Sequence, residues 1–176
     1  MSKPTMVPVK IQTLIVAQAP HPSILVLVPS EDTPQHDDSR VVPIWMGTSE
    51  ATQIGLAINQ TKFKRPLTHD LMIDMISQLD ASIIGVDIVR VEQQTFYAEL
   101  SLHQQGRTIV VDARPSDAIG LAIREQAPIR ISSDVLRQAS FPYITRSKEE
   151  VNKELSDFHS FVTTLSPDDF LPPSDI

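Results

Sequence analysis

The sequence predicts an α+β fold for this 176-residue chain, and three observations lead to that prediction. Six short runs rich in Val, Ile and Leu have the alternating pattern of half-buried strands. Four stretches carry apolar residues at helical spacing behind a Ser, Thr or Pro that suits a helix N-terminus. Three strands and two helices are expected in each half of the chain, which predicts one compact domain with a mixed or antiparallel sheet.

In the first half, the expected strands and helices span residues 7–16, 23–28, 41–45, 48–60 and 68–79. The first helix is expected to start at Thr48 or Ser49 and the second at Thr68, because a hydroxyl side chain can cap the first amides. Residues 29–40 contain four acidic side chains and no apolar period, so they are expected to form an exposed, mobile loop. Trp45 lies at a strand end and is expected in the core.

In the second half, the expected strands span residues 82–91, 95–102 and 107–111. Helices are expected to begin at Pro115 and at Ser132 or Ser133. The tail predicts a further amphipathic helix over about residues 147–165, because five apolar residues recur there at spacings of four and three. Its apolar face is expected to pack either on its own domain or across a homodimer.

The two halves resemble each other in sequence, which predicts an internal repeat. Residues 54–58 and 119–123 both have the sequence Ile-Gly-Leu-Ala-Ile. Gly55 and Gly120 therefore take matched helical positions and are expected to permit a close helix contact. We predict a domain over residues 1–140 with two βββαα copies, about 7–80 and 82–140, related by a pseudo-twofold axis, and a tail over 141–176. Chance similarity between two apolar helices is the alternative.

The composition excludes several classes of protein. Acidic residues outnumber Lys and Arg by 22 to 15, so the net charge is −7 and no overall positive field attracts nucleic acid. The absence of cysteine excludes disulfides, thiolate nucleophiles and cysteine-bound metals. No apolar run approaches the roughly 20 residues that span a bilayer. The N-terminus lacks a signal-peptide pattern, so we expect a cytoplasmic protein without a membrane segment.

Residues that differ between the two copies are the candidates for catalysis. Arg65 and Arg114 each precede a proline at the entrance to a helix, where free amides attract anions, so both are expected to bind phosphate. His69 can exchange a proton near neutral pH or ligate a metal, although a local hydrogen-bonding role is the alternative. The catalytic candidates are His69, Asp112 and Arg114. An ion pair of Arg114 with Asp112 or Asp117 is the structural alternative.

Acidic residues near these positions suggest a divalent metal. Glu50, Asp70 and Asp117 are the candidate ligands for Mg²⁺ or Mn²⁺, which prefer oxygen donors and often bridge substrate phosphates. Asp70 and Asp74 lie four residues apart and share one face of the expected helix. The alternative is that these first-turn acids only stabilise the helix dipole.

Four segments together resemble the bifunctional nuclease family. Their sequences, in order, are Pro-Ile-Trp-Met-Gly at 43–47 followed by Glu-Ala at 50–51, Arg-Pro-Leu-Thr-His-Asp-Leu-Met at 65–72, Phe-Tyr-Ala at 96–98 and Asp-Ala-Arg-Pro-Ser-Asp-Ala-Ile at 112–119. The resemblance covers about residues 7–140. It implies an α+β domain with nuclease activity on both DNA and RNA.

The sequence therefore favours a nuclease that hydrolyses phosphodiester bonds of DNA and RNA with the help of a divalent metal. The expected partners are nucleic acid as substrate and a second copy of the chain in a homodimer. A non-enzymatic dimeric module that binds a small anion or a protein partner through the Arg-Pro helix entrances is the alternative.

Overall fold

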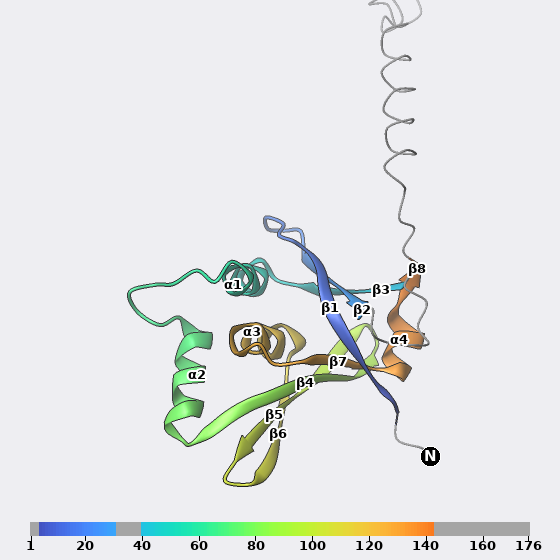
Figure 1. Ribbon diagram of the computed structural model, residues 1–176. Helices are drawn as coiled ribbons and strands as arrows, with labels where there is room; N and C mark the ends of the chain where they lie inside the picture. Colours follow the sequence, from blue (N-terminus) through green and yellow to red (C-terminus); the bar gives the residue numbers. More distant parts are fainter. Residues whose placement is uncertain (1–3, 31–39, 143–176) are drawn as a thin grey trace, which may run out of the picture. The chain divides into compact units, whose positions relative to one another are not determined.

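The computed structural model describes residues 4–30 and 40–142, and Figure 1 shows their arrangement. The strands are β1 (Met6–Ile15), β2 (Ser23–Pro29), β3 (Arg40–Met46), β4 (Ala81–Glu92), β5 (Thr95–Gln104), β6 (Arg107–Ala113), β7 (Ile129–Ser132) and β8 (Phe141–Pro142). The helices are α1 (Thr48–Ile58), α2 (Thr68–Gln78), α3 (Pro115–Glu125) and α4 (Ser133–Ala139). The chain divides into a unit over Met1–Tyr143 and a second over Ile144–Ile176, which lies outside the described residues.

The described strands form one sheet of mixed direction. Their order is β6-β5-β4-β7-β1-β2-β3-β8. Strands β4 and β7 run parallel, and the other neighbouring pairs are antiparallel. Together with the four helices, this sheet confirms the predicted α+β class.

Two short strands were missing from the sequence prediction. Strand β7 has four residues and β8 has two, which is too short for a recognisable period of two. Strand β7 pairs with β1 on one side and with β4 on the other, so it joins the two halves of the sheet. The second half therefore has an extra strand between its two helices, and the predicted pseudo-twofold repeat stays a prediction.

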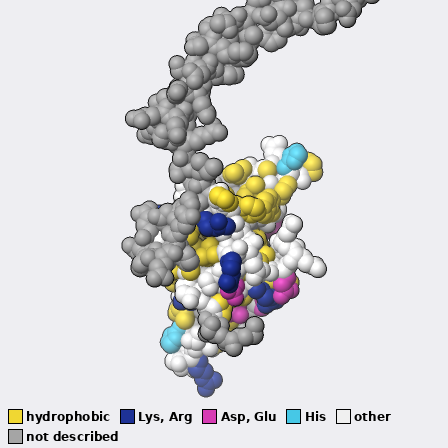
Figure 2. All heavy atoms as spheres, turned by 90° about the vertical axis from the view of Figure 1, so that its right-hand side faces the viewer, with side chains coloured by type: hydrophobic (Ala, Val, Ile, Leu, Met, Phe, Trp, Pro, Cys, Tyr) yellow, Lys and Arg dark blue, Asp and Glu magenta, His cyan; other side chains and the backbone are white. Residues whose placement is uncertain are grey.

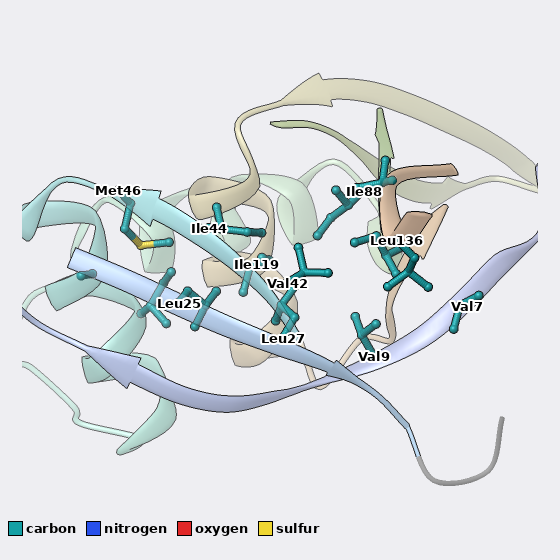
Figure 3. Packing of buried hydrophobic residues seen from close by; sticks show 14 residues of the cluster. Val7, Val9, Leu25, Leu27, Val42, Ile44, Met46, Ile88, Ile119 and Leu136 are labelled. Atoms are coloured by element: carbon teal, nitrogen blue, oxygen red, sulfur yellow. The ribbon is translucent and has the colours of Figure 1, made fainter. Parts of the chain in front are cut away.

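The main hydrophobic core joins strands β1 to β4 with helices α1, α3 and α4, as Figure 3 shows. Leu25 and Leu27 of β2 are fully buried, as are Ile54 of α1 and Ile119 of α3. A second cluster lies between β4, β5 and the other side of α3, where Leu121 is buried. Burial of such side chains is the main stabilising term in folding. Helix α3 contributes to both clusters, so its N-terminus is held firmly in place.

Three helix starts test the predicted caps. Helix α1 is preceded by Gly47, and the hydroxyl of Thr48 donates to the carbonyl of Ala17 instead of capping the helix. At the start of α2, the N-cap residue is Leu67 and the expected Thr68 cap is not formed; the backbone N–H of Leu67 instead donates to the Asp70 carboxylate. At α4, the expected cap is confirmed because Ser132 Oγ accepts from a backbone N–H.

The tail helix expected over residues 147–165 and most of the acidic loop expected over 29–40 lie outside the described residues. Within the described part, no helix is both long enough and apolar enough to cross a bilayer.

Candidate functional site

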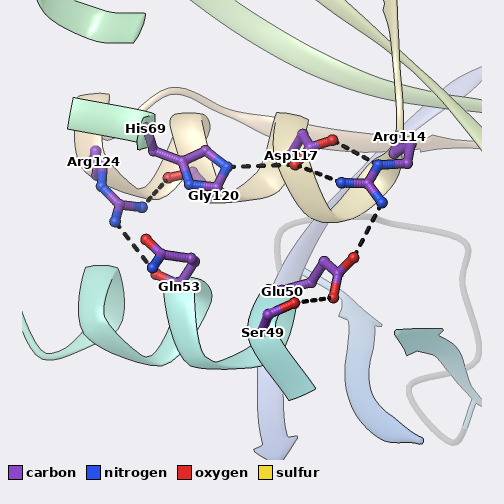
Figure 4. A network of polar contacts seen from close by, with 8 residues as sticks. All are labelled: Ser49, Glu50, Gln53, His69, Arg114, Asp117, Gly120 and Arg124. Atoms are coloured by element: carbon purple, nitrogen blue, oxygen red, sulfur yellow. Dashed lines mark hydrogen bonds and ion pairs between the residues drawn. The ribbon is translucent and has the colours of Figure 1, made fainter. Parts of the chain in front are cut away.

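Two helix N-termini meet at the candidate site. Helices α1 and α3 pack against each other, and each begins directly after a strand of the sheet. Their first turns contribute Glu50 from α1 and Asp117 from α3. Arg114 is the residue immediately before α3, and Figure 4 shows its guanidinium between the two carboxylates.

The Arg114 guanidinium binds both carboxylates. Nε donates to Asp117 Oδ2 at 2.8 Å and one terminal nitrogen donates to Asp117 Oδ1 at 3.2 Å. The other terminal nitrogen donates to Glu50 Oε1 at 3.1 Å. The Arg114 side chain is nevertheless 65% exposed, so the network orients the guanidinium and leaves it accessible to a ligand.

The carboxylate of Glu50 stays ionised in this network. Ser49 Oγ donates to Glu50 Oε2 at 2.8 Å. This bond, a backbone hydrogen bond of Glu50 itself and the Arg114 guanidinium hold the pKa of Glu50 below its ordinary value of 4.5. The carboxylates in turn raise the pKa of Arg114, first through the hydrogen bond to Asp117. The site therefore holds the Arg114 cation between the side chains of Glu50 and Asp117.

His69 lies behind Asp117 and is 6% exposed. Its Nε2 is 3.6 Å from Asp117 Oδ1, and its ring lies against Gly120, where an added Cβ would be 3.2 Å from Nε2. Gly120 thus makes room for the imidazole, whereas the nearest contact of an added Cβ at Gly55 is Leu14. The two glycines do not lie against each other, although the helices that contain them, α1 and α3, pack together as expected.

Burial keeps the imidazole of His69 neutral. Desolvation and the charge of Arg124 lower the pKa of His69 from 6.5, against the opposing effect of Asp117 and Asp70. Its Nδ1 is buried and has no hydrogen-bond partner among the described residues. The imidazole is therefore placed to hold Asp117 and has little access to a substrate.

The stability of the protein should depend on pH through His69. Because its folded-state pKa lies below 6.5, the unfolded state binds more protons as the pH falls below that value. The free energy of unfolding should therefore decrease as the pH falls below 6.5, and it should stop decreasing once the pH is below the folded-state pKa. Melting curves from about pH 8 to about pH 5 should show a smaller loss for His69→Gln, whose amide does not titrate. Equal losses in both proteins would contradict this assignment.

Asp70 is part of a different ion pair. Its Oδ1 accepts from Arg124 Nε at 2.7 Å, and its Oδ2 accepts from the backbone N–H of Leu67 at 3.0 Å. Burial raises the pKa of Asp70, but these hydrogen bonds outweigh it and lower the pKa overall. Arg124 also donates to the carbonyls of Gly120 and Gln53, so this pair ties α2 to α3 and α1.

The three carboxylates predicted as metal ligands do not form a ready metal site. Glu50 and Asp117 both bind Arg114, and Asp70 binds Arg124. Among the described residues, no group of three or more His, Asp or Glu side chains is arranged to hold a metal ion. The cations near these oxygens are arginines, so the donor set as it stands does not fit Mg²⁺ or Mn²⁺.

Two of the predicted site residues lie apart from this network. Asp112 is exposed on β6, opposite Glu99 of β5. Arg65 is exposed in the loop between α1 and α2. Neither residue lines the pocket that opens beside Arg114. Asp74, on α2, is also exposed.

A pocket of about 310 Å³ opens beside Arg114 and contains residues that the sequence prediction missed. Its walls include Glu50, Arg114, Ser116, Trp45 and Phe96. The prediction of Trp45 in the core is wrong, because this residue is 51% exposed. The available signal was its position in the sequence, since it stands only five residues before Glu50.

Comparison with known proteins is consistent with these features. The model of the bifunctional nuclease domain family matches residues 34–143. An uncharacterized protein of Mycobacterium tuberculosis is 41% identical over 74% of this chain and 81% of its own length. Bifunctional nuclease 2 of Oryza sativa is 24% identical over 85% of this chain and 45% of its own length. Bifunctional nuclease 1 of Arabidopsis thaliana is 23% identical over 65% of this chain and 34% of its own length.

The family match includes the strand before Glu50, the start of α2 and the segment from Asp112 to Asp117, so it covers the whole network around Arg114. The resemblance predicted from the sequence motifs is thereby confirmed. The chain belongs to the bifunctional nuclease domain family.

Proposed function

We propose that this protein hydrolyses phosphodiester bonds of DNA and RNA in the pocket beside Arg114. The observation that carries the proposal is an exposed arginine held at a pocket wall by two carboxylates. Such an arrangement presents a fixed cation to a phosphate while a neighbouring carboxylate can accept a proton. The plant relatives are named bifunctional nucleases, which supports a nuclease reaction.

Arg114 binds the phosphate in this proposal. A guanidinium has five N–H donors, and three of those of Arg114 are used by Asp117 and Glu50. The two that remain, one on each terminal nitrogen, can donate to two phosphate oxygens. The same hydrogen bonds stabilise the negative charge that develops on these oxygens as water attacks.

Glu50 accepts the proton of the attacking water. It lines the pocket together with Arg114, whereas Asp117 holds Arg114 from the side of α3. As the water oxygen bonds to phosphorus, its proton passes to Glu50 and the bond from phosphorus to the leaving sugar oxygen breaks. The leaving oxygen then takes a proton from solvent. His69 acts through Asp117 as a positioning residue, in place of the direct catalytic role predicted from the sequence.

The requirement for Mg²⁺ or Mn²⁺ stays a prediction, as does the homodimer. Because the carboxylates as arranged do not form a metal site, we assign no step of the reaction to an ion. Cleavage measured with and without these ions tests the prediction directly.

The test is cleavage of labelled single- and double-stranded DNA and RNA by purified protein with Mg²⁺, with Mn²⁺ and with EDTA. Glu50→Gln keeps the hydrogen bond to Arg114 but removes the basic carboxylate, so cleavage should fall about 100-fold. Glu125→Gln is the matched control, because it makes the same change at an exposed position at the end of α3.

Unchanged cleavage by Glu50→Gln would show that the reaction occurs elsewhere or comes from a contaminating nuclease. The absence of cleavage by the unmodified protein under every condition would instead favour a module that binds an anion at Arg114 without turnover.

A further inference from the structure

A second pocket, of about 400 Å³, adjoins the pocket beside Arg114. It lies between β3, the turn that joins β4 to β5, and the segment from α4 to β8. Aromatic side chains form much of its wall, namely Trp45, Phe96 and Phe141. Its volume is within the range of about 300 to 1,000 Å³ that is usual for small-molecule sites.

Two of these aromatic side chains are unusually exposed. Trp45 is 51% exposed and Phe141 is 54% exposed. Grouped apolar side chains of this size on a protein surface usually mark a binding site, whereas a single exposed one does not. Figure 2 views the molecule from the side of β8 and shows a group of hydrophobic side chains on the visible part of that face, with Lys and Arg side chains beside them.

The two pockets differ in charge. None of the described residues that line the aromatic pocket is charged, and its polar groups are the side chains of Gln93, Gln94 and Gln138. The neighbouring pocket contains the charged groups of Arg114 and Glu50. A ligand that fits both pockets therefore has an uncharged, flat, hydrogen-bonding part beside an anionic part.

The two pockets share part of their walls. Trp45, Gln94 and Phe96 line both of them, so the pockets are close enough for neighbouring parts of one ligand. A nucleotide has the required division of charge, because its base is uncharged and aromatic and its phosphate is an anion. Glutamine side chains can both donate to and accept from the edge of a base.

We propose that the aromatic pocket binds an unpaired base of single-stranded DNA or RNA, stacked on Trp45, while the adjacent phosphate lies on Arg114. The proposal rests on the proposed nuclease function and specifies its substrate. A base inside a duplex is already stacked and paired on both sides, so it must leave the helix before it enters such a pocket. Stacking on aromatic side chains is the usual way in which proteins hold unpaired bases.

The sequence offers a direct reporter, because Trp45 is the single tryptophan of the chain. Its fluorescence should be quenched when a base stacks on it. In EDTA and at low temperature, the full chain is titrated with a short oligothymidylate, with an abasic deoxyribose-phosphate strand of the same length, and with a duplex. We expect quenching by the oligothymidylate at concentrations about 5- to 150-fold lower than those needed for the other two.

Labelled strands extend the test to variants without tryptophan fluorescence. In anisotropy measurements, Trp45→Ala should weaken binding of the oligothymidylate and of a matching RNA by about 5- to 150-fold but leave the abasic strand nearly unaffected. Trp45→Phe keeps a stacking surface and should retain most of the affinity, which separates stacking from a folding defect. Phe63→Ala is the matched control, because it removes an aromatic side chain that is 50% exposed in the loop between α1 and α2.

Equal binding of the normal and abasic strands, or undiminished binding by Trp45→Ala, would overturn the base pocket. Duplex bound as tightly as single strands would overturn it too. These outcomes are separate from failure of the nuclease proposal. Base-dependent quenching without any cleavage would support base binding in the aromatic pocket and refute hydrolysis. Cleavage without base-dependent quenching would support hydrolysis and refute base binding in this pocket.

Discussion

Replacement of Arg114 by alanine is expected to lower kcat/KM for phosphodiester cleavage by about 100- to 1,000-fold. Removal of one preorganised donor to a developing oxyanion has an effect of this size in other enzymes. The change also leaves Glu50 and Asp117 without their shared cation, so two uncompensated carboxylates repel the substrate phosphate. Initial rates on a labelled oligonucleotide, measured at several substrate concentrations, separate the effects on KM and kcat.

Two variants make this result specific. Arg107→Ala removes the same charge from an exposed position on β6 and should leave most of the cleavage rate intact. Arg114→Lys keeps the positive charge but loses the planar fork that spans two carboxylates, so it should restore only a small part of the activity. If Arg107→Ala and Arg114→Ala lose activity equally, general attraction of the polyanion explains the effect and the assigned role of Arg114 is wrong.

Replacement of Asp70 by alanine should lower the free energy of unfolding by about 2 kcal/mol, with a fall in Tm of about 4–8 °C. Arg124 is only 12% exposed and loses its carboxylate partner in this variant. A buried charge without a partner destabilises a fold by about 3–5 kcal/mol, and the lower figure reflects the partial exposure of Asp70. The N–H of Leu67 also loses its acceptor.

Asp74→Ala is the matched control, because it removes an exposed carboxylate one helical turn further along α2. It should change the stability little. The difference between the unmodified protein and Asp70→Ala should shrink as the pH falls below the ordinary carboxyl value near 3.8, because the lowered pKa of Asp70 stabilises the fold only while the unfolded state is also ionised.

Cleavage by Asp70→Ala distinguishes the structural role from the metal-ligand role predicted from the sequence. Measured well below its melting temperature, the variant should keep most of its cleavage rate. Loss of cleavage with unchanged stability, restored by excess Mg²⁺ or Mn²⁺, would instead make Asp70 a metal ligand.

The strands and helices with a clear period were predictable from the sequence. The expected strand over residues 95–102 and the helix from Pro115 agree closely with β5 and α3, because alternation and a first-turn proline are local properties. Strand β7 was missed for the opposite reason. Its four residues form a strand only by pairing with β1 and β4, which are distant in sequence.

The candidate site was predicted in part. The motif from Asp112 to Asp117 drew attention to Arg114, and its ion pair with Asp117 was one of the predicted alternatives. The place of Asp70 was not predictable, because its partner Arg124 stands 54 residues later in the chain. The exposure of Trp45 was missed as well, since a large aromatic residue at a strand end is usually at least partly buried.

By itself, the sequence determined the α+β class, most strand and helix positions and the family, because these depend on local periodicity and on short motifs. Only the tertiary structure decided what the charged side chains bind. Glu50 and Arg114 are 64 residues apart in sequence, and their contact exists because α1 and α3 pack against each other. The interaction of two charges depends on their distance in space and on their exposure to water, and residue spacing specifies neither.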